Sequence, residues 1–180
     1  MTEENQITET SKHRLITILN DQDTLLLRER SEPVSFAVLE MGQLALDKTT
    51  SEAIKALKDY VSEHNGLGMA AIQLGVKLRL FVMRRPWNSN KIITVINPKI
   101  LNGEGKAVKA EGCFSVPLPQ TVNGGLVERM SFINVSYENE NGEQIEDMLV
   151  GMDARIFQHE LDHLNGKLFL DGKKFRGWAT

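Results

Sequence analysis

The chain has 180 residues and a mass of 20.2 kDa, which is enough for one compact domain with its own hydrophobic core. Its net charge of −3 and its pI near 5.8 argue against nucleic acid or an anionic membrane surface as a partner. Because Cys113 is the single cysteine, an intrachain disulfide is excluded.

The N-terminal segment is polar and acidic. Residues 1–12 lack the apolar stretch of a signal peptide, and we predict that they form a disordered tail. No apolar run approaches the roughly 18–20 residues that cross a bilayer. We therefore expect a cytoplasmic protein without a membrane partner, with residues 13–180 as its single domain.

Helical patterns come first along the chain. Residues 15–33 combine an apolar patch with a predicted turn and short helix, and residues 36–46 are predicted to be helical with an interruption at a glycine. Thr49 and Glu52 resemble a capping box before a predicted helix over 50–64. Apolar residues recur there at helical spacing, namely Ala53, Ile54, Leu57, Tyr60 and Val61.

The period then changes to that of strands. Residues 77–84 and 91–98 predict two strands, separated by a loop at 86–90. Residues 131–138 and 144–150 predict a hairpin that is closed by an Asn-Gly turn.

The last predicted element is a helix. It begins at Asp153, either as its N-cap or as a solvated carboxylate, and ends near Asn165, with Gly166 in the C′ position. The whole pattern predicts an α+β fold with antiparallel β-sheets around this central helix, which carries the sequence His-Glu-x-x-His.

The segment "QHELDHLNG" (158–166) is a candidate metal site. His159 and His163 are four residues apart, so both imidazoles lie on one face of a helix. Glu160 points roughly 100° away from His159, which places it near a metal-activated water without being a ligand. The alternative is two surface histidines and a solvated glutamate. It is disfavoured because half of the four histidines of the chain fall in this pattern.

A third ligand is not found downstream. Zinc peptidases with this motif use a later His or Glu, but Phe169 occupies the expected His position and no Glu or His follows His163. Upstream, Cys113 in "EGCFSVP" (111–117) is the best remaining ligand, although a lone cysteine is more often a buried small hydrophobe. A thiolate with two imidazoles suits zinc or iron and leaves one position open for water.

The segment "GLGMAAIQLG" (66–75) contains a formal dinucleotide fingerprint. We reject cofactor binding because the segment follows a helix and precedes a strand, which is the reverse of the required order. Its glycines instead predict a loop that a ligand approaches closely, with Gln73 as an amide donor. A glycine-rich turn with an exposed glutamine is the alternative.

Together the three segments resemble the peptide deformylase family, whose motifs G-x-G-x-A-A-x-Q, E-G-C-x-S and Q-H-E-x-D-H occur in this order. The resemblance extends from about residue 15 to 170. It implies that Cys113, His159 and His163 bind the metal. That metal is Fe(II) in most members, with zinc, nickel or cobalt as substitutes.

The resemblance also implies roles for three other residues. Glu160 acts as the base that takes a proton from the attacking water and hands it to the leaving amine. The side-chain amide of Gln73 and the backbone N–H of Phe114 hold the oxyanion. Phe114 departs from the leucine of many members, and since only its N–H is needed we expect altered rate or specificity.

Substrate contacts are implied as well. The backbone around Gly68 and Gly112 is in reach of an extended peptide. Leu67, Met152 and Ile156 line the methionine pocket, or else belong to ordinary core packing. Glu111 is expected to pair with Arg129, for which a solvated surface position is the alternative.

The implied partner is a nascent N-formylmethionyl peptide, met at the ribosome in the bacterial cytoplasm by a monomeric enzyme. A long stretch between residues 33 and 66 and an unusual loop at 118–125 depart from the family pattern. A zinc peptidase and a non-catalytic metal-binding module remain alternatives. The first lacks its third ligand, and the second would usually have lost Glu160 or Gln73.

Overall fold

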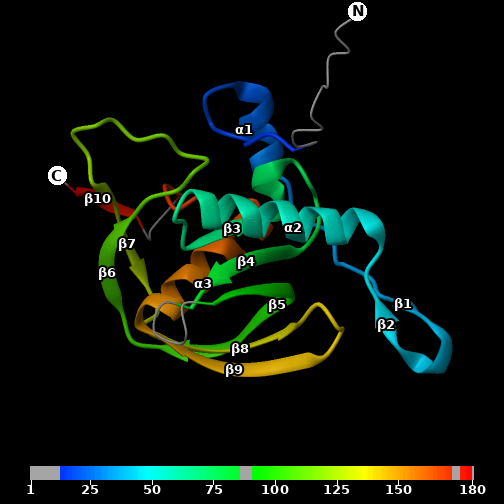
Figure 1. Ribbon diagram of the computed structural model, residues 1–180. Coiled ribbons are helices and arrows are strands. Elements are labelled where there is room, and N and C mark those ends of the chain that lie inside the picture. The colour runs from blue at the N-terminus through cyan, green and yellow to red at the C-terminus, as the bar shows by residue number, and fades with distance from the viewer. Residues whose placement is uncertain (1–12, 86–90, 172–174, 180) are drawn as a thin grey trace, which may run out of the picture.

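The computed structural model describes residues 13–85, 91–171 and 175–179, in which two long helices flank a curved antiparallel sheet (Figure 1). The predicted tail at 1–12 and the predicted loop at 86–90 lie outside the described residues. Among the described residues, no helix has the length and apolar character needed to cross a membrane.

The main sheet has five strands in the order β3-β4-β5-β8-β9, and every neighbouring pair is antiparallel. Its strands are β3 (Gly68–Ala70), β4 (Leu80–Arg84), β5 (Ile92–Glu104), β8 (Phe132–Glu138) and β9 (Gln144–Val150). The predicted strands are confirmed, and β5 continues beyond its expected end at residue 98. The predicted hairpin is confirmed too, since β8 and β9 pair from Phe132 with Val150 to Glu138 with Gln144.

Helices cover both faces of this sheet at β4. Phe81 and Met83 belong to the core cluster under helix α3 (Gly151–Leu164), whereas Leu80 and Val82 belong to the cluster under helix α2 (Lys48–Glu63). Side chains alternate between the two faces of a strand. A strand covered on both faces therefore has a continuous apolar sequence.

A second sheet, in the order β10-β7-β6, lies beside α3 (Figure 1). Its strands are β6 (Ala107–Glu111), β7 (Gly124–Arg129) and β10 (Phe175–Ala179). Gln158 of α3 binds the backbone of Met130, the residue after β7, with contacts of 2.8 and 3.1 Å. The sequence did not predict these strands, because glycines and charged residues hide their alternation. The predicted loop at 66–75 is also wrong, since it forms β3 and the 3₁₀ helix η2 (Ala71–Leu74).

The helix starts differ from their predictions. Asp47 is the N-cap of α2, and its carboxylate accepts a bond of 2.8 Å from the Thr50 backbone N–H. The predicted capping box at Thr49 is therefore wrong by two positions. Helix α3 begins after Val150, and Asp153 instead pairs with Arg85 at 2.9 Å.

The helix ends agree better with the sequence. Gly166 has a φ of 68°, the left-handed conformation expected at C′. The short helix predicted within 15–33 is confirmed as α1 (Asp21–Leu27), which Asn20 caps.

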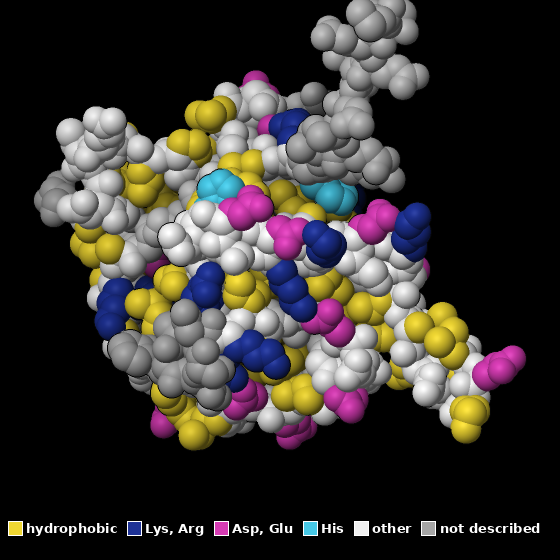
Figure 2. All heavy atoms as spheres, viewed as in Figure 1, with side chains coloured by type: hydrophobic (Ala, Val, Ile, Leu, Met, Phe, Trp, Pro, Cys, Tyr) yellow, Lys and Arg dark blue, Asp and Glu magenta, His cyan; other side chains and the backbone are white. Residues whose placement is uncertain are grey.

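A projecting hairpin replaces the helix predicted over 36–46. It consists of β1 (Ala37–Val38), the 3₁₀ turn η1 (Glu40–Gly42) and β2 (Leu44–Ala45). Met41 and the glycine after it both have positive φ, which an α-helix cannot accommodate. Apolar side chains stand exposed on this hairpin (Figure 2), and Met41 is 99% exposed.

Candidate metal centre

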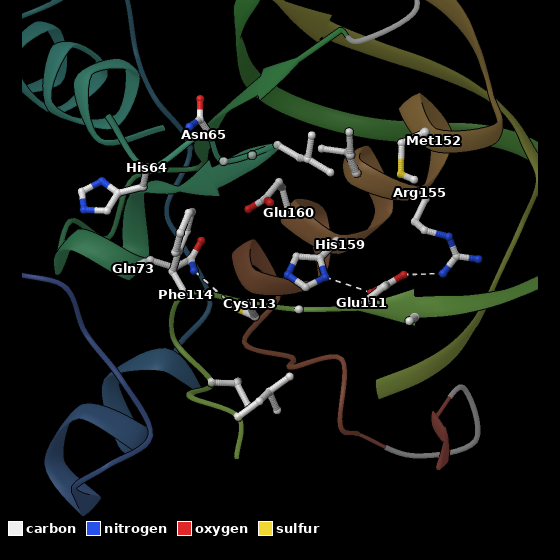
Figure 3. Close-up of a pocket in the computed structure, with 18 of the residues that line it drawn as sticks. His64, Asn65, Gln73, Glu111, Cys113, Phe114, Met152, Arg155, His159 and Glu160 are labelled. Atoms are coloured by element: carbon white, nitrogen blue, oxygen red, sulfur yellow. Dashed lines mark hydrogen bonds and ion pairs between the residues drawn. The ribbon is translucent and has the colours of Figure 1, made fainter. Parts of the chain in front are cut away.

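One cysteine and two histidines converge beside α3, although fifty positions of sequence separate Cys113 from His163. Their ligand atoms lie within 4.8 Å of one another, and the Cys113 Sγ is 3.2 Å from the His163 Nε2. The helix brings His159 and His163 to one face, and the chain after β6 carries the thiol to them. Figure 3 shows Cys113 beside His159. Within the described residues, this donor set of one sulfur and two imidazoles fits zinc or ferrous iron.

Glu111, the last residue of β6, orients the first histidine. Its Oε2 accepts a hydrogen bond of 2.9 Å from the Nδ1 of His159, which leaves Nε2 for a metal. Arg129 donates twice to the same carboxylate, at 3.0 and 2.9 Å, and Arg155 donates at 2.5 Å. The expected pair of Glu111 with Arg129 is thus present, and Arg129 is buried, not solvated.

These contacts keep Glu111 ionised. Burial alone would raise its pKa, but the hydrogen bonds from His159 and Arg129 lower the pKa to about 2. Burial and the charge of His159 lower the pKa of His163 well below the usual histidine value. The lowered pKa holds His163 in the neutral form that binds metals. For His159, burial also opposes the charged form, yet its hydrogen bonds with Cys113 and Glu111 raise its pKa overall.

Glu160 is a buried carboxyl beside this cluster. Burial is the main cause that raises its pKa to about 7, and the negative charge of Glu111 adds to it. Its Oε2 has no hydrogen-bond partner among the described residues. A carboxyl group that titrates near neutral pH can accept a proton and return it within one reaction cycle.

Gln73 faces the same cluster with a defined orientation. Its Oε1 accepts a bond of 2.9 Å from the Ala70 N–H, so its NH₂ group points the other way. That group donates to the Ser115 Oγ at 3.0 Å and lies 3.5 Å from the Cys113 Sγ (Figure 3). Gln73 is only 2% exposed, which excludes the alternative of a surface glutamine.

A cavity of about 540 Å³ joins these groups. Ten of the eleven candidate site residues line it, and the other, His163, is buried behind them. The ten are Leu67, Gly68, Gln73, Gly112, Cys113, Phe114, Met152, Ile156, His159 and Glu160. The structure therefore places every candidate residue at one site.

Sequence reasoning missed other residues that line this cavity. Arg155 lies one helical turn before His159, so its position on the shared face was available as a signal. His64 and Asn65, at the end of α2, carried no such signal. Phe169 packs its ring on His159, with centroids 6.0 Å apart and planes 26° apart. Phe169, which occupies the position of the third ligand in zinc peptidases, is thus a buried packing residue in this protein.

A buried carboxyl beside one thiol and two imidazoles is typical of a metal-dependent hydrolase. The family model described as polypeptide deformylase matches residues 15–176. The chain belongs to this family, whose members remove the N-formyl group from newly synthesised polypeptides.

Individual relatives agree with the family model. The chain is 42% identical over 127 residues to a peptide deformylase of Pseudothermotoga lettingae, covering 70% of each sequence. It is 39% identical over 139 residues to that of Aquifex aeolicus, covering 74% of this chain and 77% of the relative. The crystal structure of the Thermotoga maritima peptide deformylase superposes with a TM-score of 0.74 at 34% identity, covering 90% of this chain and 97% of that one.

Proposed function

We propose that residues 13–180 form a catalytic domain that deformylates N-formylmethionyl peptides, with a divalent metal held by Cys113, His159 and His163. The observation that carries the proposal is the meeting of this donor set with the buried Glu160 carboxyl in one cavity. A bound metal supplies Lewis-acid polarisation and lowers the pKa of water.

We propose Fe(II) as the metal in the cell, with zinc, nickel or cobalt as substitutes. The sulfur and nitrogen donors support this choice without selecting iron over zinc. Ferrous iron and a thiolate can both be oxidised, so iron-loaded protein should lose activity in air. Full activity after long aerobic incubation, with iron still bound, would contradict the choice of iron.

Glu160 has the role of proton carrier in this proposal. It takes a proton from the attacking water and delivers it to the nitrogen of the departing methionine amine. Its buried, unpartnered oxygen and its pKa of about 7 support this role. Formate and a peptide with a free amino terminus are the products.

Two hydrogen-bond donors are assigned to the developing oxyanion. The Gln73 amide, held by Ala70 and Ser115, directs its NH₂ group at the cluster. The backbone N–H of Phe114 has no acceptor among the described residues and is the second donor. Donors that are oriented before the reaction stabilise charge without reorganising.

The remaining candidate residues are assigned to substrate binding. Leu67, Met152 and Ile156 supply apolar surface for the methionine side chain, and the backbone at Gly68 and Gly112 contacts an extended peptide. A related deformylase from Acinetobacter baumannii, 30% identical with a TM-score of 0.72 over 88% of this chain and 96% of that one, is described as bound to Met-Ala-Ser. A formylated form of that tripeptide is therefore a suitable substrate.

We further propose that the enzyme acts as a monomer in the bacterial cytoplasm, where formylated chains emerge from the ribosome. The family membership supports a nascent peptide as the partner.

The deciding experiment is formate release from formyl-Met-Ala-Ser by protein loaded anaerobically with Fe(II). Rapid release that a chelator abolishes is the expected result. Metal-loaded, folded protein that releases no formate would refute the proposal. Cleavage of casein under the same conditions would instead revive the peptidase alternative.

A further inference from the structure

Three aromatic side chains form a cluster at the edge of the cavity. The rings of Tyr60 and His64, at the end of α2, stack with centroids 4.0 Å apart and planes 14° apart. The ring of Phe114 meets both edge-on, at 5.2 Å from Tyr60 and 6.1 Å from His64. We call these three residues the aromatic clamp. The Nδ1 of His64 lies 2.9 Å from the Tyr60 carbonyl oxygen, which ties the imidazole to the helix end.

Gly66 leaves the space that the Phe114 ring occupies. A Cβ at this position would lie 2.8 and 2.9 Å from two carbons of that ring, closer than real contacts allow. The Gly66 N–H donates to the Val61 carbonyl at 2.8 Å, and Asn65 has a φ of 50°. The turn that ends α2 is therefore shaped to hold the ring.

The backbone around Phe114 is held on its other side. The Val116 N–H donates to the Cys113 carbonyl at 3.0 Å, which forms a tight turn. The carbonyl of Ser115 accepts from Ile18 at 3.0 Å. These bonds tie the neighbours of Phe114 but not its own N–H, which has no acceptor among the described residues. The contacts of the ring therefore restrict how the peptide group before Phe114 can rotate.

We propose that the aromatic clamp aims the Phe114 N–H into the cavity, so that Tyr60 and His64 are positioning residues for the oxyanion. This inference rests on the proposed function and deepens it. Figure 3 shows Phe114 between His64 and the groups around Glu160, so Phe114 connects the aromatic side chains at the end of α2 to the cavity. A displacement of about 1 Å in a catalytic group can cost about 10²-fold in rate. A variant that only partly loosens the Phe114 N–H should therefore show a measurable loss of rate.

The test compares His64→Ala with His64→Phe, which restores an aromatic ring. We expect His64→Ala to lower kcat about tenfold, because misplacing a donor costs less than the loss of about 10²–10³-fold that follows its removal. KM for formyl-Met-Ala-Ser should stay within about twofold, because the clamp acts in the transition state. His64→Phe should recover most of the lost kcat. A change confined to KM would overturn the proposal, because it would indicate direct contact with substrate.

A second readout does not depend on turnover. In zinc-loaded protein, the NMR order parameter of the Phe114 amide should be lower in His64→Ala than in wild type or Tyr60→Phe, because the loosened N–H moves more. Metal content should be equal in all three proteins. An unchanged order parameter would contradict the clamp. If His64→Ala does not fold, His64→Leu provides the same comparison.

A double-mutant cycle separates positioning from a general effect on stability. In the Phe114→Leu background the ring contact is absent, so His64→Ala should lower kcat no further. An equal loss in both backgrounds would overturn the inference. If wild-type protein releases no formate, the proposed function fails, whereas the order parameter of the Phe114 amide still reports on the clamp.

Discussion

The carboxylate of Glu160 packs directly against the backbone of Gly68. A Cβ at position 68 would lie 2.6 Å from the Glu160 Oε1 and 3.0 Å from its Cδ and Cγ. Strand β3 thus approaches α3 so closely that only glycine leaves room for the buried carboxyl. This contact explains, on steric grounds, why the segment "GLGMAAIQ" needs its second glycine.

Gly68→Ala should therefore displace the carboxylate. We expect kcat for deformylation to fall by up to about 10²-fold, since misplacing a reacting group by about 1 Å has that effect. Metal content should not change, because the three atoms nearest to the added methyl group all belong to Glu160, which is not one of the clustered donors. Kinetics should be measured in a cycle with Glu160→Gln. A further loss of kcat when Gly68→Ala is added to Glu160→Gln would show that the methyl group acts elsewhere.

Glu160→Gln tests the proton carrier itself. The substitution keeps the size of the side chain but removes its ability to take a proton, so kcat should fall by about 10²–10⁴-fold. Because Glu160 is not one of the three clustered donors, metal content by atomic absorption should equal that of wild type. Full deformylation by a metal-loaded Glu160→Gln protein would exclude Glu160 as the base.

The buried ion pairs of Glu111 should matter for stability. Glu111→Gln leaves the buried Arg129 and Arg155 without their shared carboxylate, which should cost about 3–5 kcal/mol in the free energy of unfolding. Urea denaturation with the same metal bound measures it. Glu128→Gln is the matched control, because its pair with Arg176 lies near the surface and should contribute little. Equal losses in the two variants would contradict this account.

The pair of Asp23 with Arg14 predicts a pH dependence of stability. A hydrogen bond from Arg14 lowers the pKa of Asp23 to about 2, below the value of about 3.9 in unfolded chains. The pair therefore stabilises the fold above about pH 4, and this contribution is lost as the pH falls toward about 2. Wild type should exceed Asp23→Asn in unfolding free energy at pH 6, and the difference should shrink by pH 3. The exposed Asp21→Asn is the control, and a constant difference would refute the prediction.

The cap of α2 distinguishes the observed helix start from the one expected from sequence. Asp47→Ala removes the acceptor of the Thr50 N–H and should cost about 1 kcal/mol. Thr49→Ala should leave the unfolding free energy nearly unchanged, although Thr49 was predicted as the cap. Chemical denaturation of both variants decides between the two starts. A larger loss for Thr49→Ala would favour the capping box.

Short-range patterns in the sequence determined a large part of this protein. The spacing of His159 and His163 specifies a shared helical face on α3, and an apolar period specifies α2. The Asn-Gly turn specifies the β8–β9 hairpin. These features are predictable because the interacting residues are close in the chain, where helix and strand geometry alone relates them.

Only the tertiary structure decided how the site is assembled. Cys113 reaches His163, and Gln73 turns its NH₂ group toward Cys113, because sheets and helices bring distant segments together. The raised pKa of Glu160 and the tight contact with Gly68 depend on burial, which no local pattern encodes. The second sheet escaped prediction for a related reason, since long-range packing selects among several locally acceptable conformations.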